Sequence, residues 1–308
     1  MARTNFAVVA VALALVAATS VSASQPTVFS ALAQWPAGTY ASPAFAPDGK
    51  TLFVTHGAGT EWTLMISHYR GGAWSAPQAA PFSGRWRDIE PAMAPDGSYL
   101  LFVSNRPASG DGKPLDGFYN GAARPARGGN LWRVDRVRGG WSQPVRLPDT
   151  VNANASIYAP SLARNGDLVF MQPDPKTSRF RLYRARFVGG AYAAPEPLSF
   201  SDGVTADFDP VIAPDGSSII FSSVRAPTPK GQSGVFVAVA DGEGWRAPVA
   251  LDPLVLGTET RLSPDRSTLF FSSDRPTPDY PAPPPGSTGQ KIWSIPYSIG
   301  RPGAASGG

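Results

Sequence analysis

Cysteine is absent from the 308 residues, and histidine occurs only at His56 and His68. Without cysteine the chain forms no disulfide and no thiolate metal site, and it has no N-terminal cysteine to carry a lipid anchor. Two histidines are too few for a multi-histidine metal centre. We therefore expect neither a metal nor a cofactor.

Charge is also scarce, since 16% of the residues are charged and the formal net charge is +4, with no run of Lys or Arg. A basic run or stripe is the usual mark of a nucleic-acid-binding surface, so we expect no nucleic-acid partner. The Gly-x-Ser-x-Gly nucleophile elbow and the phosphate-binding loop are missing as well. No motif therefore predicts a catalytic residue.

Long apolar runs are missing except near the N-terminus. Arg3 precedes the apolar segment Phe6–Ala18, and Val21-Ser22-Ala23 fits a small-x-small cleavage site. This pattern is typical of a secretory signal peptide, which we place at residues 1–23. No later segment approaches the ~20 apolar residues of a membrane span. We therefore predict a periplasmic or secreted protein without a membrane span.

Proline and glycine, in contrast, are abundant, with 33 and 32 residues, and they mark a repeated hairpin. The segment Asp209–Arg225 reads DPVIAPDGSSIIFSSVR, in which two apolar runs flank Pro-Asp-Gly. Pro sets φ for a turn, Asp bonds its own backbone and Gly tolerates positive φ, so the segment predicts a β-hairpin. Related segments begin at Ser42, Glu90, Ala159 and Glu259.

The repeats recur at a regular spacing, with one longer interval. Their turn residues Pro47, Pro95, Arg164, Pro214 and Pro264 are separated by 48, 69, 50 and 50 residues. A period near 50 with strand–turn–strand content is the sequence signature of a β-propeller. The long second interval indicates an insertion of about twenty residues, in the same repeat as Pro95.

Each hairpin is followed by two further strand signals, so each repeat predicts a four-stranded antiparallel blade. After Ser42–Thr55, for example, come Trp62–Tyr69 and Trp74–Pro77, joined by a Gly pair that suits a tight hairpin. We assign the aromatic residue of the fourth strand to packing between blades. The fold prediction is all-β, a single propeller over residues 24–300 with a flexible tail at 301–308.

The fifth repeat lacks a fourth strand of its own. Phe29 stands 13 residues before Ser42, much as Trp245 stands 14 residues before Glu259. The segment Thr27–Gln34 is therefore predicted to close the ring by pairing with Lys291–Tyr297, which removes the exposed sheet edges. Five blades result, and a sixth would need a repeat that the sequence does not show.

The repeats resemble the Pro-Asp-Gly repeats of the TolB-like β-propeller family. The resemblance rests on Glu90-Pro91, Ala94-Pro95-Asp96-Gly97, Phe102 and Ser104-x-Arg106, and on the equivalent residues of the other repeats. It covers nearly all of the chain after residue 23. The resemblance implies a propeller fold, and relatives serve as periplasmic protein-binding scaffolds, as sugar-active enzymes and as domains beside peptidases.

An acid that opens the hairpin and an Arg that follows it occur together in three repeats. The pairs are Glu90 with Arg106, Asp209 with Arg225, and Glu259 with Arg275, while the repeats that begin at Ser42 and Ala159 lack both members. Both ends of a hairpin lie at the same end of a blade, so the charges can meet. A buried acid without its Arg is costly, and we therefore predict structural ion pairs.

The irregular connections all fall on one face of the ring, because strands alternate in direction. Binding residues concentrate on such loops. The insertion carries aromatic and Arg side chains that recognition surfaces favour, and acids enter the ring near the same face. The candidate ligand-binding residues are Asp88, Phe118, Tyr119, Arg124, Arg127 and Asp207.

We therefore hypothesise an exported, monomeric binding or scaffold propeller that recognises an envelope protein, peptide or glycan through this face. The alternative is a carbohydrate-active enzyme, a hydrolase or lyase. It would use carboxylates at the channel mouth, namely Asp88, Glu90, Asp207, Asp209 and Glu259. A purely structural envelope protein is a third hypothesis. Paired acids favour the binder, and two unpaired carboxylates in a pocket favour the enzyme.

Overall fold

The computed structural model describes residues 25–58, 61–109, 112–283, 285 and 289–298. The predicted signal peptide and the predicted C-terminal tail lie outside the described residues. In this part of the chain the regular structure is β-strand apart from one short 3-10 helix, η1 (Ser30–Ala33). No helix among the described residues is long and apolar enough to span a membrane.

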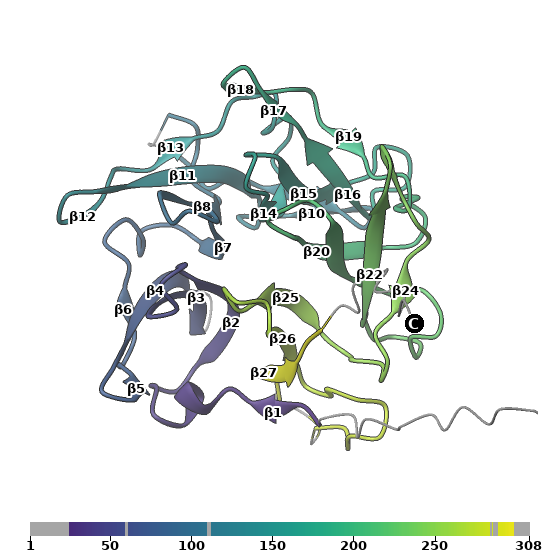
Figure 1. The fold of residues 1–308 in the computed structure, drawn as a ribbon. Helices are drawn as coiled ribbons and strands as arrows, with labels where there is room; N and C mark the ends of the chain where they lie inside the picture. The colour runs from purple at the N-terminus through teal and green to yellow at the C-terminus, as the bar shows by residue number, and fades with distance from the viewer. Residues whose placement is uncertain (1–24, 59–60, 110–111, 284, 286–288, 299–308) are drawn as a thin grey trace, which may run out of the picture.

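Five antiparallel sheets surround a common axis, which confirms the predicted five-bladed propeller (Figure 1). We number the blades one to five in chain order. The innermost strands face the axis, and neighbours contact one another around the ring, with blade five against blade one. These innermost strands are β2 (Thr39–Phe45), β7 (Asp88–Met93), β14 (Tyr158–Leu162), β20 (Asp207–Ile212) and β25 (Thr258–Leu262).

Two further long strands follow in each blade. The second strands are β3 (Thr51–Ala58), β8 (Tyr99–Ser104), β15 (Leu168–Pro173), β21 (Ser218–Ser223) and β26 (Thr268–Ser273). The third strands are β4 (Glu61–Arg70), β11 (Asn130–Val137), β16 (Phe180–Ala185), β22 (Gly234–Asp241) and β27 (Lys291–Pro296). The Pro-Asp-Gly segments form the predicted turns. In blade four, Asp215 Oδ1 accepts the Ser217 N–H at 3.0 Å, and Gly216 has a φ of 75°.

The outermost strands are short and interrupted, which differs from the single fourth strand expected. In blade one, β5 (Ala73–Trp74) and β6 (Gln78–Ala79) both pair with β4 and flank Pro77. Proline has no N–H for the ladder, so the strand breaks there. In blade three, β17 (Phe187–Val188) continues the third strand after β16 and pairs with the outer segment β18 (Ala191–Tyr192). The other outer segments are β12 (Gly140–Trp141), β13 (Val145–Arg146), β19 (Glu196–Pro197), β23 (Gly244–Trp245) and β24 (Val249–Ala250).

The N-terminal segment closes the ring, as predicted. Strand β1 (Thr27–Val28) pairs antiparallel with β27, with Thr27 opposite Ser294, and the Phe29 N–H continues the ladder to the Ile292 carbonyl at 2.9 Å. The strand is shorter than expected, because the chain turns into η1 after Phe29. The Phe29 ring packs edge-on at centroid distances of 5.5–6.5 Å against Trp35, Phe45, Trp74 and Phe270.

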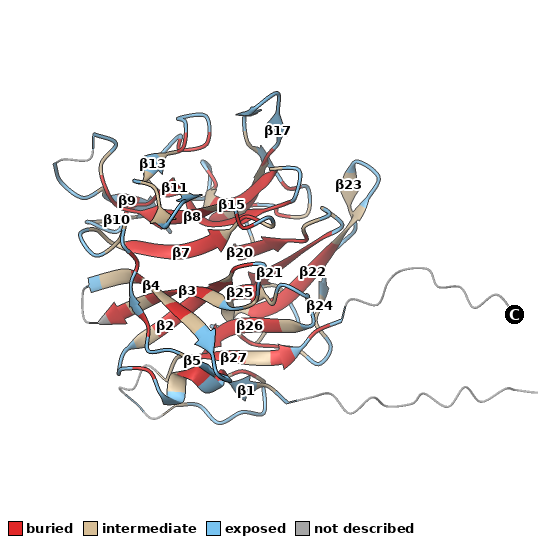
Figure 2. Ribbon diagram, turned by 60° about the vertical axis from the view of Figure 1, so that its left-hand side comes forward, coloured by how far each residue is buried: buried red, intermediate tan, exposed pale blue. Residues whose placement is uncertain are grey.

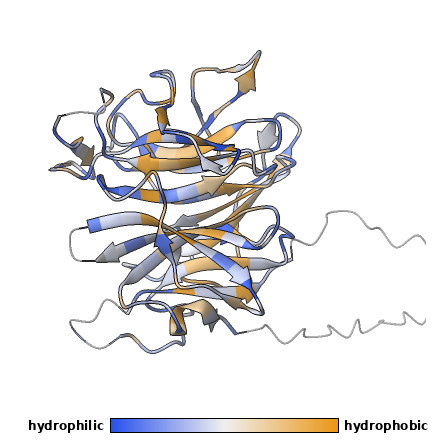
Figure 3. Ribbon diagram, turned by 90° about the vertical axis from the view of Figure 1, so that its left-hand side faces the viewer, coloured by the Kyte–Doolittle hydropathy of each residue, from blue (hydrophilic) through white to orange (hydrophobic). Residues whose placement is uncertain are grey.

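The core lies between the blades rather than along the axis. Four second strands place a phenylalanine at the same position, and these side chains are buried: Phe102, Phe170, Phe221 and Phe271. Blade one has Val54 at that position, preceded by the fully buried Phe53. Figure 2 shows the strands as mostly buried and the connecting loops as exposed, and Figure 3 shows the apolar residues concentrated in the strands.

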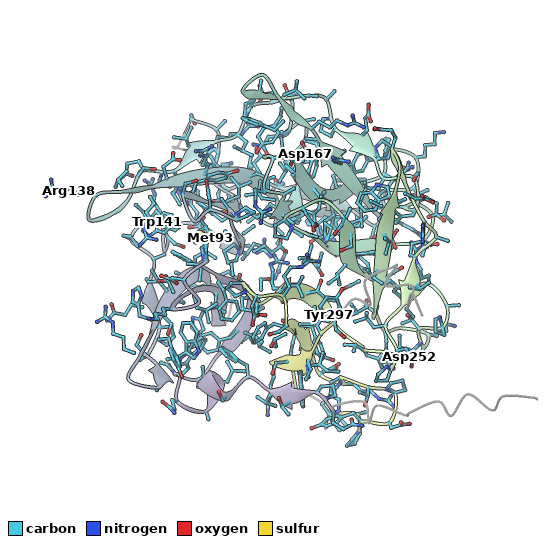
Figure 4. The ribbon with its side chains drawn as sticks, in the orientation of Figure 1. Met93, Arg138, Trp141, Asp167, Asp252 and Tyr297 are labelled. Atoms are coloured by element: carbon cyan, nitrogen blue, oxygen red, sulfur yellow. The ribbon has the colours of Figure 1, made fainter. Side chains whose placement is uncertain are left out.

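The fourth-strand aromatics join neighbouring blades, as expected. Trp141 of blade two meets Phe53 of blade one edge-on at 5.3 Å, in the cluster that also holds Met93 (Figure 4). Large aromatic surfaces buried in this way contribute much of the stability of a core.

Each inner strand carries a β-bulge at the same place. The strand register shifts there in all five blades, and the residue that opens the repeat adopts a left-handed backbone conformation. The φ values are 51° at Ser42, 53° at Glu90, 49° at Ala159, 49° at Asp209 and 54° at Glu259. A bulge re-aims a side chain next to it. Five equivalent bulges therefore set the side chains that surround the axis.

Candidate ligand-binding site on the loop face

The insertion of blade two is folded onto blade three. Its hairpin consists of β9 (Gly117–Tyr119) and β10 (Ala122–Arg124). The Phe118 N–H donates to Ser156 Oγ at 2.9 Å, and the Asn120 N–H donates to the Ser178 carbonyl at 2.7 Å. The insertion is thereby anchored to its neighbour at several points.

The predicted candidates of the insertion lie in different surroundings. Tyr119 is packed against Tyr158 and Phe180, at centroid distances of 6.0 and 5.1 Å, and supports the hairpin. Arg124 stacks on Tyr119 at 5.2 Å, and Phe118 is 56% exposed on the outside of the hairpin. Arg127 alone among these four lines the pocket described next.

A pocket of about 380 Å³ lies on this face between blades one and two and the insertion. The linker between the blades, the start of β4 and the end of the insertion form its walls. Its charged and aromatic lining residues are Glu61, Trp62, Arg85, Trp86, Arg87 and Arg127. Pockets of this size are typical of small-molecule and cofactor sites. We call this cavity the loop-face pocket.

Asn105 holds the walls of the loop-face pocket together. Its side-chain oxygen accepts the Arg87 N–H at 2.9 Å, and its side-chain nitrogen donates to the Ala126 carbonyl at 2.9 Å. Its backbone N–H donates to the Arg87 carbonyl at 3.2 Å. One buried amide thus joins the linker to the insertion and fixes where Arg87 enters the pocket.

The Arg side chains of the pocket lie beside its tryptophans. The Arg85 guanidinium lies 5.1 Å from the Trp86 ring centre, and the Arg87 guanidinium lies 5.9 Å from that of Trp62. Nε and Nη1 of Arg87 are buried and have no hydrogen-bond partner among the described residues. Sequence reasoning missed these residues, although the alternation Arg85-Trp86-Arg87 in a linker was a usable signal.

Asp88 and Asp207, both expected to contact a ligand, are instead fully buried inside the fold. Asp88 forms an ion pair with Arg106 at 2.7 Å, and Asp207 forms one with Arg225 at 2.7 Å. The hydroxyl of Ser83 donates to Asp88 at 2.8 Å, and that of Ser201 donates to Asp207 at 2.7 Å. Both acids are therefore structural and inaccessible to a ligand.

These ion pairs correct the predicted ones, in which Arg106 and Arg225 paired with Glu90 and Asp209. In both blades the acid that pairs with the Arg stands two residues before the predicted one, at Asp88 and at Asp207. Asp88 lies opposite Ser104 in the ladder, and the bulge turns Glu90 toward the axis.

The third predicted ion pair, between Glu259 and Arg275, is also absent among the described residues. The Arg275 guanidinium donates to the Pro278 carbonyl instead. Gly257 stands where blade two has Asp88, so blade five offers this Arg no carboxylate at that position.

Carboxylates from three blades gather around Arg261 in the central channel. Glu90 accepts the Ala159 N–H at 2.6 Å, and Asp209 accepts the Glu259 N–H at 2.7 Å. Arg261 is buried, and its Nη1 donates to the Thr260 carbonyl at 2.7 Å. The acids bond the backbone of the following blade, so their first role is to join blades.

Hydroxyl groups bond the backbone of the next blade in the same way. Thr55 Oγ1 accepts the Glu90 N–H at 2.9 Å, and Ser161 Oγ accepts the Ile212 N–H at 3.0 Å. With the two carboxylates, these bonds connect four successive pairs of blades. Strand β1 connects the fifth pair.

Burial controls the ionisation of the channel acids. Desolvation, with a smaller contribution from Asp209, raises the pKa of Glu90 to about 7. The same two causes raise the pKa of Glu259 to about 7. Burial also raises the pKa of Asp209 and lowers that of Arg261.

We expect stability to fall as the pH rises from 5.5 to 8.5. With a folded pKa of about 7 and an ordinary value of 4.5, Glu90 and Glu259 hold more protons in the folded than in the unfolded chain between these values. Their stabilising contribution is complete below pH 4.5 and is lost as the pH rises through about 7. Between pH 5.5 and 8.5 each residue should therefore lower the free energy of unfolding by roughly 2 kcal/mol. Urea unfolding at both pH values measures the effect.

The matched variant for this experiment is Glu90→Gln with Glu259→Gln. Glutamine keeps the acceptor that the Ala159 N–H needs, and it does not ionise. The double variant should show a flatter pH dependence. An equally steep dependence in the variant would mean that other groups titrate.

On the turn face the channel opens into a funnel of about 220 Å³. Prolines and apolar residues of all five inner hairpins line it, together with Arg164, Arg261 and Arg266. Among the described residues, no group of three or more His, Cys, Asp or Glu is arranged to hold a metal ion.

Comparisons with known proteins identify the fold of this chain but no family to which it belongs. No protein-family model matches the chain. No curated protein matches it either.

Solved propellers resemble the structure at low sequence identity. The α-L-arabinofuranosidase PaAbf62A from Podospora anserina, solved in complex with cellotriose, has a TM-score of 0.53 at 10% identity, over 85% of this chain and 91% of that one. A thermostable family-43 glycoside hydrolase has a TM-score of 0.52 at 10% identity, over 83% and 88%.

TolB from Acinetobacter baumannii has a TM-score of 0.47 at 14% identity. The match covers 85% of this chain and 55% of TolB, so the chain spans about half of that protein's length. The chain thus shares its propeller fold with these two glycoside hydrolases, at an identity that shows the fold alone, and the resemblance of its repeats to the TolB-like family remains a sequence-based one.

Proposed function

We propose that this chain is an exported binding propeller that recognises an envelope protein, peptide or glycan at the loop-face pocket. The observation that carries the proposal is the composition of that pocket, in which Trp62, Trp86, Arg87 and Arg127 converge from separate segments. Tryptophan and arginine are the residues most enriched at energetically important contacts. The anchored insertion and Asn105 hold these side chains in place before a ligand arrives, which lowers the entropic cost of binding.

Binding explains the acids better than catalysis does. A glycosidase needs two carboxyl groups about 5–9.5 Å apart that flank the substrate. Among the described residues, Glu61 is the only acid that lines the loop-face pocket, and it is exposed. Glu90 and Asp209 bond backbone N–H groups beside Arg261. The raised pKa of Glu90 suits a general acid, and this is the observation that keeps the carbohydrate-active enzyme as the alternative.

We expect Trp86→Ala with Arg127→Ala to weaken ligand binding at least tenfold and to leave the fold intact. Both side chains are at least partly exposed, so their removal creates no buried cavity. The measurement is binding of the purified protein to an array of oligosaccharides and peptides, followed by titration of the hits.

The control is Arg138→Ala, at the exposed tip of the turn between β11 and β12 on the opposite face (Figure 4). Equal affinity of the double variant and the control would place recognition elsewhere on the ring. Release of sugar from any hit, lost in Glu90→Gln, would support the enzyme instead.

A further inference from the structure

The loop-face pocket has an excess of positive charge. In the described part of the chain, Arg85, Arg87 and Arg127 line it, and Glu61 is the one acid among the lining residues. The side chains of Arg127 and Glu61 are exposed, whereas Arg87 is half-buried. An anionic group on the ligand would therefore meet an attractive field from the walls of the pocket.

Arg87 indicates where that anionic group lies. Its backbone N–H is held by Asn105, and its guanidinium lies near the Trp62 ring, so its position is fixed. Yet Nε and Nη1 are buried and have no partner among the described residues. Leaving a buried charged donor unpaired is unfavourable, so an acceptor that the ligand brings to this guanidinium relieves a cost that the free protein carries.

Glu90 does not satisfy Arg87. The two groups interact at a distance, and Arg87 lowers the pKa of Glu90 against the larger raising effect of burial. Oε2 of Glu90 accepts the Ala159 N–H at 2.6 Å, and neither Nε nor Nη1 of Arg87 donates to Glu90. Arg87 therefore remains available on the pocket side.

The size and walls of the pocket favour a sugar over a protein surface. A volume of about 380 Å³ is in the range of small-ligand sites, whereas a stable protein interface buries about 800 Å² on each partner. Trp62 and Trp86 offer indole surface, against which the C–H face of a pyranose ring packs. Arginine matches the planar geometry of a carboxylate.

We infer that the loop-face pocket recognises a glycan that carries carboxylates, with a uronic acid residue at Arg87 and Arg127 and a sugar ring against Trp86. This inference rests on the proposed binding function.

The test is titration of the purified protein with a uronic acid trisaccharide, with its carboxyl-reduced neutral counterpart and with a Glu-containing tripeptide. Tryptophan fluorescence and calorimetry report binding. We expect the acidic trisaccharide to bind at least tenfold more tightly than the neutral one. Arg87→Gln and Arg127→Gln should each remove at least tenfold of that preference, and rising salt should weaken it.

Arg138→Gln is the matched control on the opposite face and should change nothing. Arg127 is exposed, so Arg127→Gln keeps the test valid if Arg87→Gln folds poorly. Equal binding of the neutral trisaccharide, abolished by Trp86→Ala, would overturn the acidic ligand and retain the binding function. Binding of the tripeptide alone, or of no probe at millimolar concentration, would overturn the glycan. The proposed function itself fails only if the array gives no ligand that depends on the loop-face pocket.

Discussion

Phe29→Ala should destabilise the protein by about 3–5 kcal/mol, which is the usual cost of removing a buried phenylalanine. The side chain is 8% exposed and packs against four aromatic rings. One ring follows η1 in the chain, two belong to blade one and one belongs to blade five. Phe29 also follows directly on the two residues that close the ring. The substitution therefore leaves a cavity at the joint between the first and last blades, and urea unfolding measures the loss.

Phe118→Ala is the matched control, because Phe118 is 56% exposed. Its loss should stay within about 0.5 kcal/mol. Deletion of residues 24–35 should be more damaging still, since it also exposes the edge of β27. If the Phe29 variant and the deletion both melt like the unmodified protein, the ring does not depend on its N-terminal segment.

Arg106→Ala should have a comparable effect, about 3–5 kcal/mol, because it leaves the Asp88 carboxylate buried without its counter-charge. The Asp88 side chain is fully buried, and that of Arg106 is 9% exposed. Arg106 Nε also donates to Ser104 Oγ at 2.8 Å, and the guanidinium lies 5.1 Å from the Trp132 ring centre. Desolvation raises the pKa of Asp88, and Arg106 partly offsets that effect.

The exposed pair of Arg246 and Asp241 provides the control. Their atoms lie 3.5 Å apart and their side chains are 59% and 63% exposed, so Arg246→Ala should cost at most about 1 kcal/mol. In a double-mutant cycle, Asp88→Ala should recover part of the loss caused by Arg106→Ala. Strict additivity would show that the two groups do not interact.

The number of blades and the closure of the ring could be predicted because they depend on local turn chemistry and on spacing. Pro-Asp-Gly segments specify a turn wherever they occur, and the position of Phe29 relative to Ser42 repeats that of Trp245 relative to Glu259. The end of the closing strand was not predictable in this way, because the aromatic partners of Phe29 come from distant segments.

The ion pairs show a limit of prediction from a single sequence, because the pattern did not identify which acid pairs with each Arg. The occurrence of Arg106 and Arg225 with an acid was a sound signal, but Asp88 and Glu90 both precede the same turn by similar distances. Which of them meets the Arg depends on the bulge, whose backbone conformation at Glu90 is left-handed. A non-glycine residue rarely adopts that conformation, so the sequence carried little indication of it.

For the candidate pocket, the sequence predicted the face of the ring on which it lies but not the residues that form it. Alternation of strand direction placed the irregular loops together, and Arg127 was among the residues named. Trp62, Arg87 and Asn105 come from three separate segments, and only the folded ring brings them to one cavity.

The side chains that bond the backbone of the following blade have a consequence for how the protein melts. Open repeat arrays fray from their ends, since each repeat contacts only its neighbours. This ring has no free end, because Thr55, Glu90, Ser161 and Asp209 each hold an N–H of the next blade and β1 joins the last blade to the first. We expect one cooperative thermal transition in which the calorimetric and van't Hoff enthalpies agree, as if the five blades were a single folding unit.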